Sequence, residues 1–271
     1  MTVMTEDAAA GEVQRTGFAL RLRGVSKVFG SGEKATTALQ GVDLDVAPGE
    51  FVSVVGSSGC GKSTLLSIVA GLDTATTGTV EVNGRVALMF QDATLLPWLT
   101  ARGNVELALK LRGVGARERK ERAQELLEVV RLGPWGEARP HELSGGMRQR
   151  VALARCLAQD AGIVLMDEPL GALDAMTRDH LHDEIERVSQ EQHLAILLVT
   201  HNMREAVRLG DRVVLMTPSP GRIVFEQEVA LPRPRVMDSP EAASRAGELT
   251  RRIKAGGHLG EEQSTDAEVA S

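Results

Sequence analysis

The chain has 271 residues and a formal net charge of -6 at pH 7, with 42% hydrophobic and 25% charged residues. This length is enough to bury a sizeable core, and the composition is ordinary for a globular protein. The acidic balance argues against a nucleic-acid-binding protein, which normally carries a basic excess. Two cysteines, Cys60 and Cys156, provide no disulfide framework and favour a reducing compartment.

The amino-terminal residues 1–16 are acidic and lack the apolar core of a signal peptide. We therefore expect a flexible leader there. The longest purely apolar run in the C-terminal half, residues 194–199, is far too short to span a membrane. If this chain acts at a membrane, we expect it to do so as a peripheral protein at the membrane surface.

Strand and helix patterns alternate along the rest of the chain. Residues 18–55 are strand-rich, residues 62–71 have a short helical pattern, and residues 78–91 again read as strand. A charged helix follows over 116–132, with Gly133 as its expected C-cap. Strand signals return at 162–167, 194–201 and 211–216, with helices between them. This order predicts a parallel sheet covered on both faces and an all-helical insertion at about 92–158.

The tail, residues 236–271, differs in kind from the rest. Ser239 is a suitable N-cap, Pro240 suits the first helical position, and Gly256 suits a helix stop. We expect one loosely docked helix followed by a disordered end.

The sequence GSSGCGKST at 56–64 fits the phosphate-loop pattern, with an apolar strand before it and a helix after it. Its glycines let successive backbone amides point at phosphate oxygens. Lys62 would reach the β and γ phosphates, and Ser63 would ligate Mg²⁺. No base stands beside Cys60 in the sequence, so we expect no nucleophilic role for it. The predicted ATP-binding residues are Gly56, Ser57, Ser58, Gly59, Cys60, Gly61, Lys62, Ser63 and Thr64.

Two acidic residues end the apolar run GIVLM at 162–166. A carboxylate at the end of a buried strand beside a phosphate loop is suited to hold Mg²⁺, which is the role predicted for Asp167. Glu168 would point differently and take a proton from an attacking water.

A second group of small residues, Ser144, Gly145 and Gly146, opens an amphipathic helix. Bare amides at a helix start form an anion site, although a serine there is also an ordinary N-cap. No lysine stands inside this triplet to complete a phosphate cradle.

These motifs, together with FQD at 90–92, GALD at 171–174 and TH at 200–201, resemble the ATP-binding subunit of an ABC transporter from about residue 18 to 231. The resemblance implies an α/β fold: a RecA-like P-loop NTPase core with an antiparallel β subdomain and the helical subdomain at 92–158. The ABC ATPase domain would span 17–235. In this family two cassettes pack head to tail, so Ser144, Gly145 and Gly146 would bind the γ-phosphate of ATP held by the other copy.

The remaining roles are likewise implied by the resemblance. Phe29 would stack on adenine, unless it is a core residue. Gln91 would touch Mg²⁺ and the attacking water, and Asp174 would lie at the dimer seam. His201 would contact the γ-phosphate and orient the water with Glu168. The spacing of His180 and His182 predicts no further metal site.

A single cassette without membrane spans is typical of importers, and TLLPWLTARGNVELAL at 94–109 is similar to the nitrate, sulfonate and taurine import group. Leu170 and Asn202 depart from that group's usual residues. The resemblance implies an ATP- and Mg²⁺-dependent ATPase on the cytoplasmic face of the inner membrane, working with permease subunits and indirectly a solute-binding protein. The alternatives are a soluble non-transport ABC ATPase and the ATPase half of an exporter. Trp98 would face the permease or be buried in a turn.

Overall fold

The computed structural model describes residues 17–171, 173, 175–218, 220–233 and 235, and in the tail residues 240, 243, 244, 247, 248, 250 and 251. The expected leader, Asp174, Ser239 and Gly256 lie outside these residues. The seven tail positions that are described are helical.

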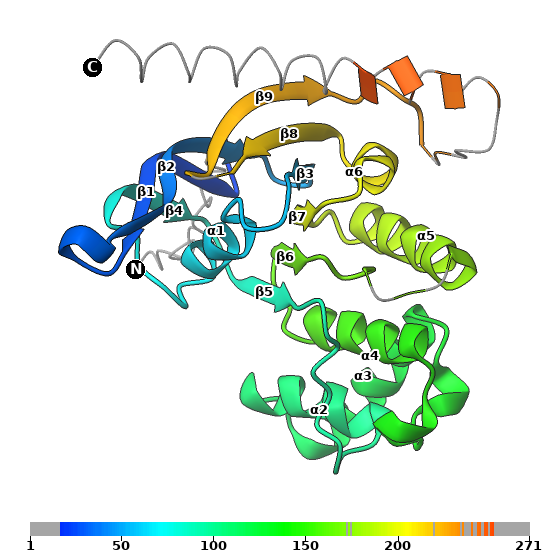
Figure 1. Cartoon of the computed structure of the whole chain (residues 1–271). Helices are drawn as coiled ribbons and strands as arrows, with labels where there is room; N and C mark the ends of the chain where they lie inside the picture. Colours follow the sequence, from blue (N-terminus) through cyan, green and yellow to red (C-terminus); the bar gives the residue numbers. More distant parts are fainter. Residues whose placement is uncertain are drawn as a thin grey trace, which may run out of the picture.

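Two sheets form the framework (Figure 1). The first is antiparallel with the order β2-β1-β4, made of β1 (Leu20–Phe29), β2 (Thr36–Val46) and β4 (Thr77–Val82). The second has the order β5-β6-β7-β3-β8-β9 and is parallel except for its edge strand β9. Its strands are β5 (Val86–Met89), β6 (Ile163–Asp167), β7 (Ala195–Thr200), β3 (Phe51–Val55), β8 (Arg212–Thr217) and β9 (Arg222–Glu228). The predicted α/β core with an antiparallel subdomain is confirmed.

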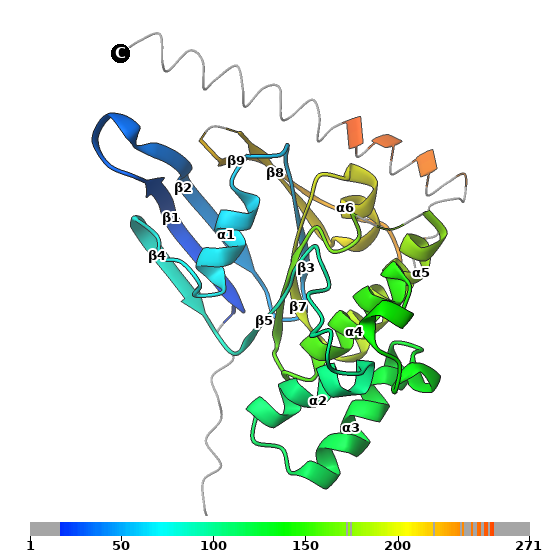
Figure 2. The same cartoon turned by 60° about the horizontal axis from the view of Figure 1, so that its bottom comes forward.

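Helices cover the larger sheet from two sides (Figures 1 and 2). Helix α1 (Lys62–Val69) lies between the two sheets. Helices α2 (Ala101–Leu111), α3 (Ala116–Val129) and α4 (Gly145–Leu157) form a lobe on the other side of the larger sheet. Helices α5 (Ala175–Glu191) and α6 (Met203–Leu209) complete the cover, and short 3-10 helices occupy Gly32–Lys34, Gly133–Trp135 and Pro140–Glu142. Within the described residues, no helix combines the length and apolar character needed to cross a bilayer.

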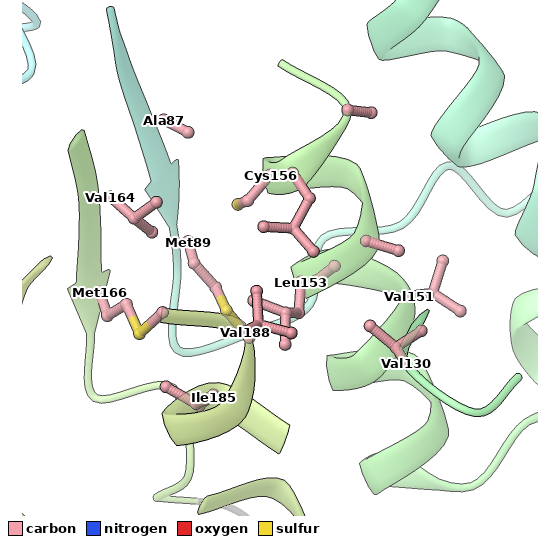
Figure 3. Packing of buried hydrophobic residues seen from close by; sticks show 14 of the residues in the cluster. Ala87, Met89, Val130, Val151, Leu153, Cys156, Val164, Met166, Ile185 and Val188 are labelled. Carbon is pink, nitrogen blue, oxygen red and sulfur yellow. The ribbon is translucent and has the colours of Figure 1, made fainter. Parts of the chain in front are cut away.

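The hydrophobic core forms separate layers on the two faces of the larger sheet, because successive residues of a strand point to opposite faces. On β6, Val164 and Met166 pack toward the helical lobe, and Ile163 and Leu165 pack toward α1 and the antiparallel sheet. Figure 3 shows the first of these layers, in which Met89 lies beside Leu153 and Val188, and Met166 lies on the neighbouring strand β6. The helical lobe is thus anchored to the same strands that end at the candidate site.

Two sequence expectations need correction. The single strand expected over 78–91 is two strands in different sheets, because the chain turns at Asn83 and Gly84, where Gly84 has a φ of 132°. The expected C-cap at Gly133 is also wrong. Arg131 takes the left-handed position with a φ of 56°, and its amide donates to Glu128 O while Leu132 donates to Leu127 O, so the helix closes before Gly133.

The sheet order gathers the predicted chemistry at one edge. The phosphate loop follows β3, Asp167 ends β6, and His201 directly follows β7, which lies between those two strands. Carboxyl ends of parallel strands share one edge of a sheet, and this edge is where ligands bind in open α/β folds.

Candidate nucleotide-binding site

The phosphate loop is a tight turn between β3 and α1. Gly59 and Gly61 have φ values of 82° and 89°, which residues with side chains rarely adopt. Gly61 caps α1 without a side-chain hydrogen bond, so the first amides of the helix stay available to an anion. The Lys62 ammonium donates to the carbonyls of Gly56 at 2.9 Å and Ser57 at 3.0 Å, which holds it across the loop.

Cys60 packs beneath this loop. Its side chain is fully buried, and a Cβ built on Gly56 would lie only 2.5 Å from its sulfur. Burial raises the pKa of the Cys60 thiol, which keeps the sulfur neutral. The Cys60 side chain therefore fills space under the backbone of the loop.

The first acidic residue, Asp167, lies at the end of β6 and is hydrogen-bonded to the Ser63 side chain. Its burial, reinforced by the neighbouring Glu168 charge, raises the pKa of the Asp167 carboxyl. The hydroxyl and the carboxylate are hard oxygen ligands placed together beside the phosphate loop. This donor set fits Mg²⁺.

The second acidic residue, Glu168, is held in a strained conformation. Its φ of 43° is unusual for a residue with a side chain, and such strain is common at functional sites. Glu168 Oε1 lies 3.7 Å from Lys62 Nζ, and Oε2 lies 2.9 Å from His201 Nδ1. The structure therefore brings together the lysine, the acid and the histidine that the sequence predicts.

Gln91 follows β5 and is exposed. Its backbone carbonyl accepts a hydrogen bond from the buried Gln149 on α4, which ties Gln91 to the helix that Ser144 opens. A Cβ built on Gly171 would lie 3.4 Å from Gln91 Nε2. The Gln91 side chain thus reaches the segment that follows Glu168.

Phe29 ends β1 with 44% of its surface exposed, so it is not a core residue. The Lys27 ammonium lies 4.9 Å from the Phe29 ring centroid and is paired with Asp73 at 2.5 Å. The hydrogen bond from Lys27 lowers the pKa of the Asp73 carboxyl. The sequence reasoning missed Lys27, although residues two apart on a strand share a face, so its place beside Phe29 was visible in the alternation.

Ser144 caps α4, and its hydroxyl accepts from the Met147 amide at 3.2 Å. Ser144 is exposed, Gly145 is partly buried, with a Cβ there 3.6 Å from Leu173 Cδ2, and Gly146 is buried against Thr177. No hydrogen bond or ion pair recorded for residues 17–171 joins this triplet to the phosphate loop, and Figure 1 shows α4 in the helical lobe, away from α1. The Ser144–Gly146 triplet therefore lies apart from the phosphate loop of its own copy.

This arrangement has known counterparts. The family model described as ABC transporter matches residues 39–171. The chain is 46% identical over 259 residues to the aliphatic sulfonates import ATP-binding protein SsuB of Burkholderia ambifaria, covering 93% of this chain and 77% of that protein. It is also 46% identical over 232 residues to the taurine import ATP-binding protein TauB of Mesorhizobium japonicum, covering 80% and 90%.

The chain belongs to the ABC transporter family of ATP-binding proteins. This cassette is thus an ABC-type ATPase, as the resemblance implied. Its structure is similar to the dimeric structure of a post-hydrolysis state of the ATP-binding cassette MJ0796 bound to ADP and Pi. The TM-score is 0.70 at 33% identity, covering 78% of this chain and 99% of that one.

Two further residues of the cassette support the site and were missed. Glu205 on α6 is buried and accepts a hydrogen bond from Thr200, the residue before His201. Its signal in the sequence is the N-cap Asn202 followed three residues later by a glutamate, a helix-start pattern. Gly221 lies against the phosphate loop, where a Cβ would be 2.2 Å from Cys60 O, and no local signal in the sequence indicates this contact.

Proposed function

We propose that this chain is the ATPase subunit of an importer, a homodimer on the cytoplasmic face of the inner membrane that powers separate permease subunits. The observation that carries the enzymatic part is the Glu168 carboxylate, 2.9 Å from His201 and 3.7 Å from the Lys62 ammonium. The importer part is supported by relatives whose names describe import of aliphatic sulfonates and of taurine.

ATP would lie along the edge formed by β1, the phosphate loop and β6. The exposed Phe29 ring would stack on adenine, and the amides of residues 56–64 would bind the phosphates. The Lys62 ammonium, which donates to the Gly56 and Ser57 carbonyls in this structure, would instead bind phosphate oxygens, because charged oxygens attract an ammonium more strongly than neutral carbonyls.

Ser63 and Asp167, with Gln91, would hold Mg²⁺. The bound ion would supply positive charge that offsets the charge on the phosphates. These residues suit the ion because two of them are already hydrogen-bonded beside the loop, so little rearrangement is needed. Gln91 would join them from the segment after β5.

Glu168 would accept the proton of the attacking water. His201 contacts Glu168 through Nδ1, and its ring is 59% exposed, which leaves Nε2 for the γ-phosphate. Positioning and electrostatic stabilisation would account for most of the rate enhancement, as in other phosphoryl-transfer enzymes.

Each ATP would be completed by the second copy. Ser144, Gly145 and Gly146 lie at the start of α4 with Ser144 exposed, and the amides and dipole of a helix start favour a phosphate. The triplet would bind the γ-phosphate of the other copy's ATP, and Asp174 would lie at the seam. An isolated copy would then hydrolyse ATP poorly.

The transported solute would be a small anion of the sulfonate, taurine or nitrate type. Trp98 is 69% exposed, which favours the interpretation that this residue faces a permease over the interpretation that it is buried in a turn. Uptake of labelled anions into vesicles containing the cassette, its permease and its solute-binding protein tests the proposal. ATP-dependent accumulation of a sulfonate is expected. Co-purification with nucleic acid and without a permease would favour the non-transport alternative, whereas outward transport would favour the exporter alternative.

A further inference from the structure

A buried polar cluster lies directly behind the pair formed by Glu168 and His201. It consists of Thr200 at the end of β7, Glu205 on α6 and His182 on α5. Glu205 and His182 are 5% and 4% exposed. The hydrolytic steps proposed above use neither of these two side chains.

Glu205 fixes the turn that carries His201. The Thr200 hydroxyl donates to Glu205 Oε2 and accepts from the Asn202 amide at 3.0 Å. The Asn202 side chain in turn accepts from the amides of Arg204 and Glu205 at 3.0 and 3.4 Å. The residues on both sides of His201 are therefore tied to one carboxylate, whereas the imidazole itself is largely exposed.

His182 stands on the other side of that carboxylate. Its Nε2 lies 3.6 Å from Glu205 Oε1, and its Nδ1 lies 3.7 Å from Asp179 Oδ1. Both ring nitrogens and Glu205 Oε1 are buried without a hydrogen-bond partner in the part of the chain that the structure describes. A buried polar group without a partner is costly, and a shift of about 0.5 Å would bring the ring and the carboxylate into hydrogen-bond range.

The same face of α5 also holds the segment after Glu168. Arg178, one turn before His182, donates to the carbonyls of Leu170 at 3.4 Å and Leu173 at 2.6 Å. A cavity of about 40 Å³ lies where these contacts meet, and its lining includes Glu168, Arg178, Thr200, His201 and Glu205. It has room for an ordered water. Arg178 and His182, on one face of α5, thus lie beside the segment after Glu168 and beside Glu205, which holds the turn of His201.

We infer that His182 and Glu205 are positioning residues for hydrolysis. Glu205 holds the His201 turn, and His182 transmits the position of α5 to Glu205. His201 Nδ1 therefore stays within hydrogen-bond distance of Glu168 only while His182 on α5 stays beside Glu205 on α6. This inference rests on the proposed roles of Glu168 and His201.

Steady-state ATPase kinetics of the full chain test the first step. Thr200→Val keeps the shape of the side chain but removes the hydroxyl, and Glu205→Met keeps the length but removes the acceptor. Each is expected to lower kcat about tenfold and to leave KM within about twofold, because the phosphate loop is untouched. Thr200→Ser and Glu205→Gln retain the required bond and should keep kcat within about twofold of the wild type.

A double-mutant cycle tests the second step. His182→Phe should lower kcat, and adding it to Glu205→Met should lower kcat no further, because both changes break one linkage. Glu186→Gln is the control: Glu186 is a buried carboxylate on the same helix as His182, but it pairs with Arg233 at 2.9 Å and not with Thr200. The control should lose thermal stability and keep its kcat.

The outcomes separate the inference from the function on which it rests. If His201→Ala keeps wild-type turnover, the proposed role of His201 is wrong. If His201→Ala is inactive while Thr200→Val and Glu205→Met retain full kcat, or lose no more than Glu186→Gln, the positioning role is overturned. If the effects of His182→Phe and Glu205→Met on kcat are additive, His182 does not act through Glu205, and its positioning role is overturned. Should Glu205→Met fail to fold, the Thr200→Val and Thr200→Ser pair decides alone.

Discussion

Gly221 offers a sharp test of how the smaller elements support the phosphate loop. A Cβ at this position would lie 2.2 Å from Cys60 O, 2.6 Å from Met216 Cε and 3.0 Å from Ala38 O. Carbon atoms do not approach oxygen that closely, so Gly221→Ala must separate the two segments by at least about 0.8 Å. The Met216 tip can move aside, but the Cys60 carbonyl belongs to the phosphate loop.

Gly221 itself has little room to retreat. Its amide donates to Ala38 O at 3.0 Å, and its carbonyl accepts from the Gln40 amide at 3.0 Å. The phosphate loop is therefore the segment that shifts. A misplacement of about 1 Å in a catalytic site costs on the order of 10²-fold in rate, and overpacking a core costs about 1–3 kcal/mol of stability.

The assay is kcat/KM for ATP in Gly221→Ala, measured together with binding of a fluorescent ATP analogue and urea unfolding. Gly162→Ala is the control, because a Cβ there meets nothing within 4 Å. We expect kcat/KM to fall about 10²-fold in Gly221→Ala and to stay near the wild-type value in Gly162→Ala. Wild-type kcat/KM in Gly221→Ala, with the protein folded, would refute the reasoning.

The remaining predictions concern the base, the core, one thiol and the permease. Glu168→Gln should retain ATP binding, lose turnover and accumulate as an ATP-bound dimer, as seen by gel filtration; wild-type turnover would refute the base assignment. Leu153→Ala should lower the free energy of unfolding in urea by about 2–5 kcal/mol, because Leu153 is 1% exposed, and a loss below 1 kcal/mol would contradict its place in the core. Burial raises the pKa of Cys156 to about 12 from an ordinary value of 9.0, so the unfolded chain releases this proton first. The free energy of unfolding should then fall by up to about 1.4 kcal/mol per pH unit between these two values, and Cys156→Ala should lack that component in urea titrations at several pH values. Trp98→Ala should leave the ATPase rate of the isolated cassette unchanged and reduce uptake in reconstituted vesicles; unchanged uptake would remove Trp98 from the permease contact.

Motifs that are contiguous in the chain were predictable. Residues 56–64 form a phosphate loop because their glycines and the flanking strand and helix act locally, and Ser144 caps α4 for the same reason. The parallel sheet was predictable from the sequence because buried parallel strands appear as short continuous apolar runs.

Contacts between distant segments were not predictable from the sequence. His182 meets Glu205 because α5 packs beside α6, and Gly221 meets Cys60 because the chain before β9 folds over the loop. The helix end at Val129 depends on Arg131 in a left-handed conformation, where its side chain pairs with the buried Glu184 at 2.6 Å. Propensity alone favours glycine at such a position, and the tertiary ion pair is one interaction available to offset that preference.

The ATPase rate per chain, followed across a dilution series of the wild-type protein, tests most directly whether two copies share each nucleotide. The proposed arrangement predicts that the rate per chain falls steeply once light scattering shows monomers, because each ATP then lacks the Ser144–Gly146 triplet of a second copy. A dilute monomer that hydrolyses ATP at the undiminished rate would contradict it.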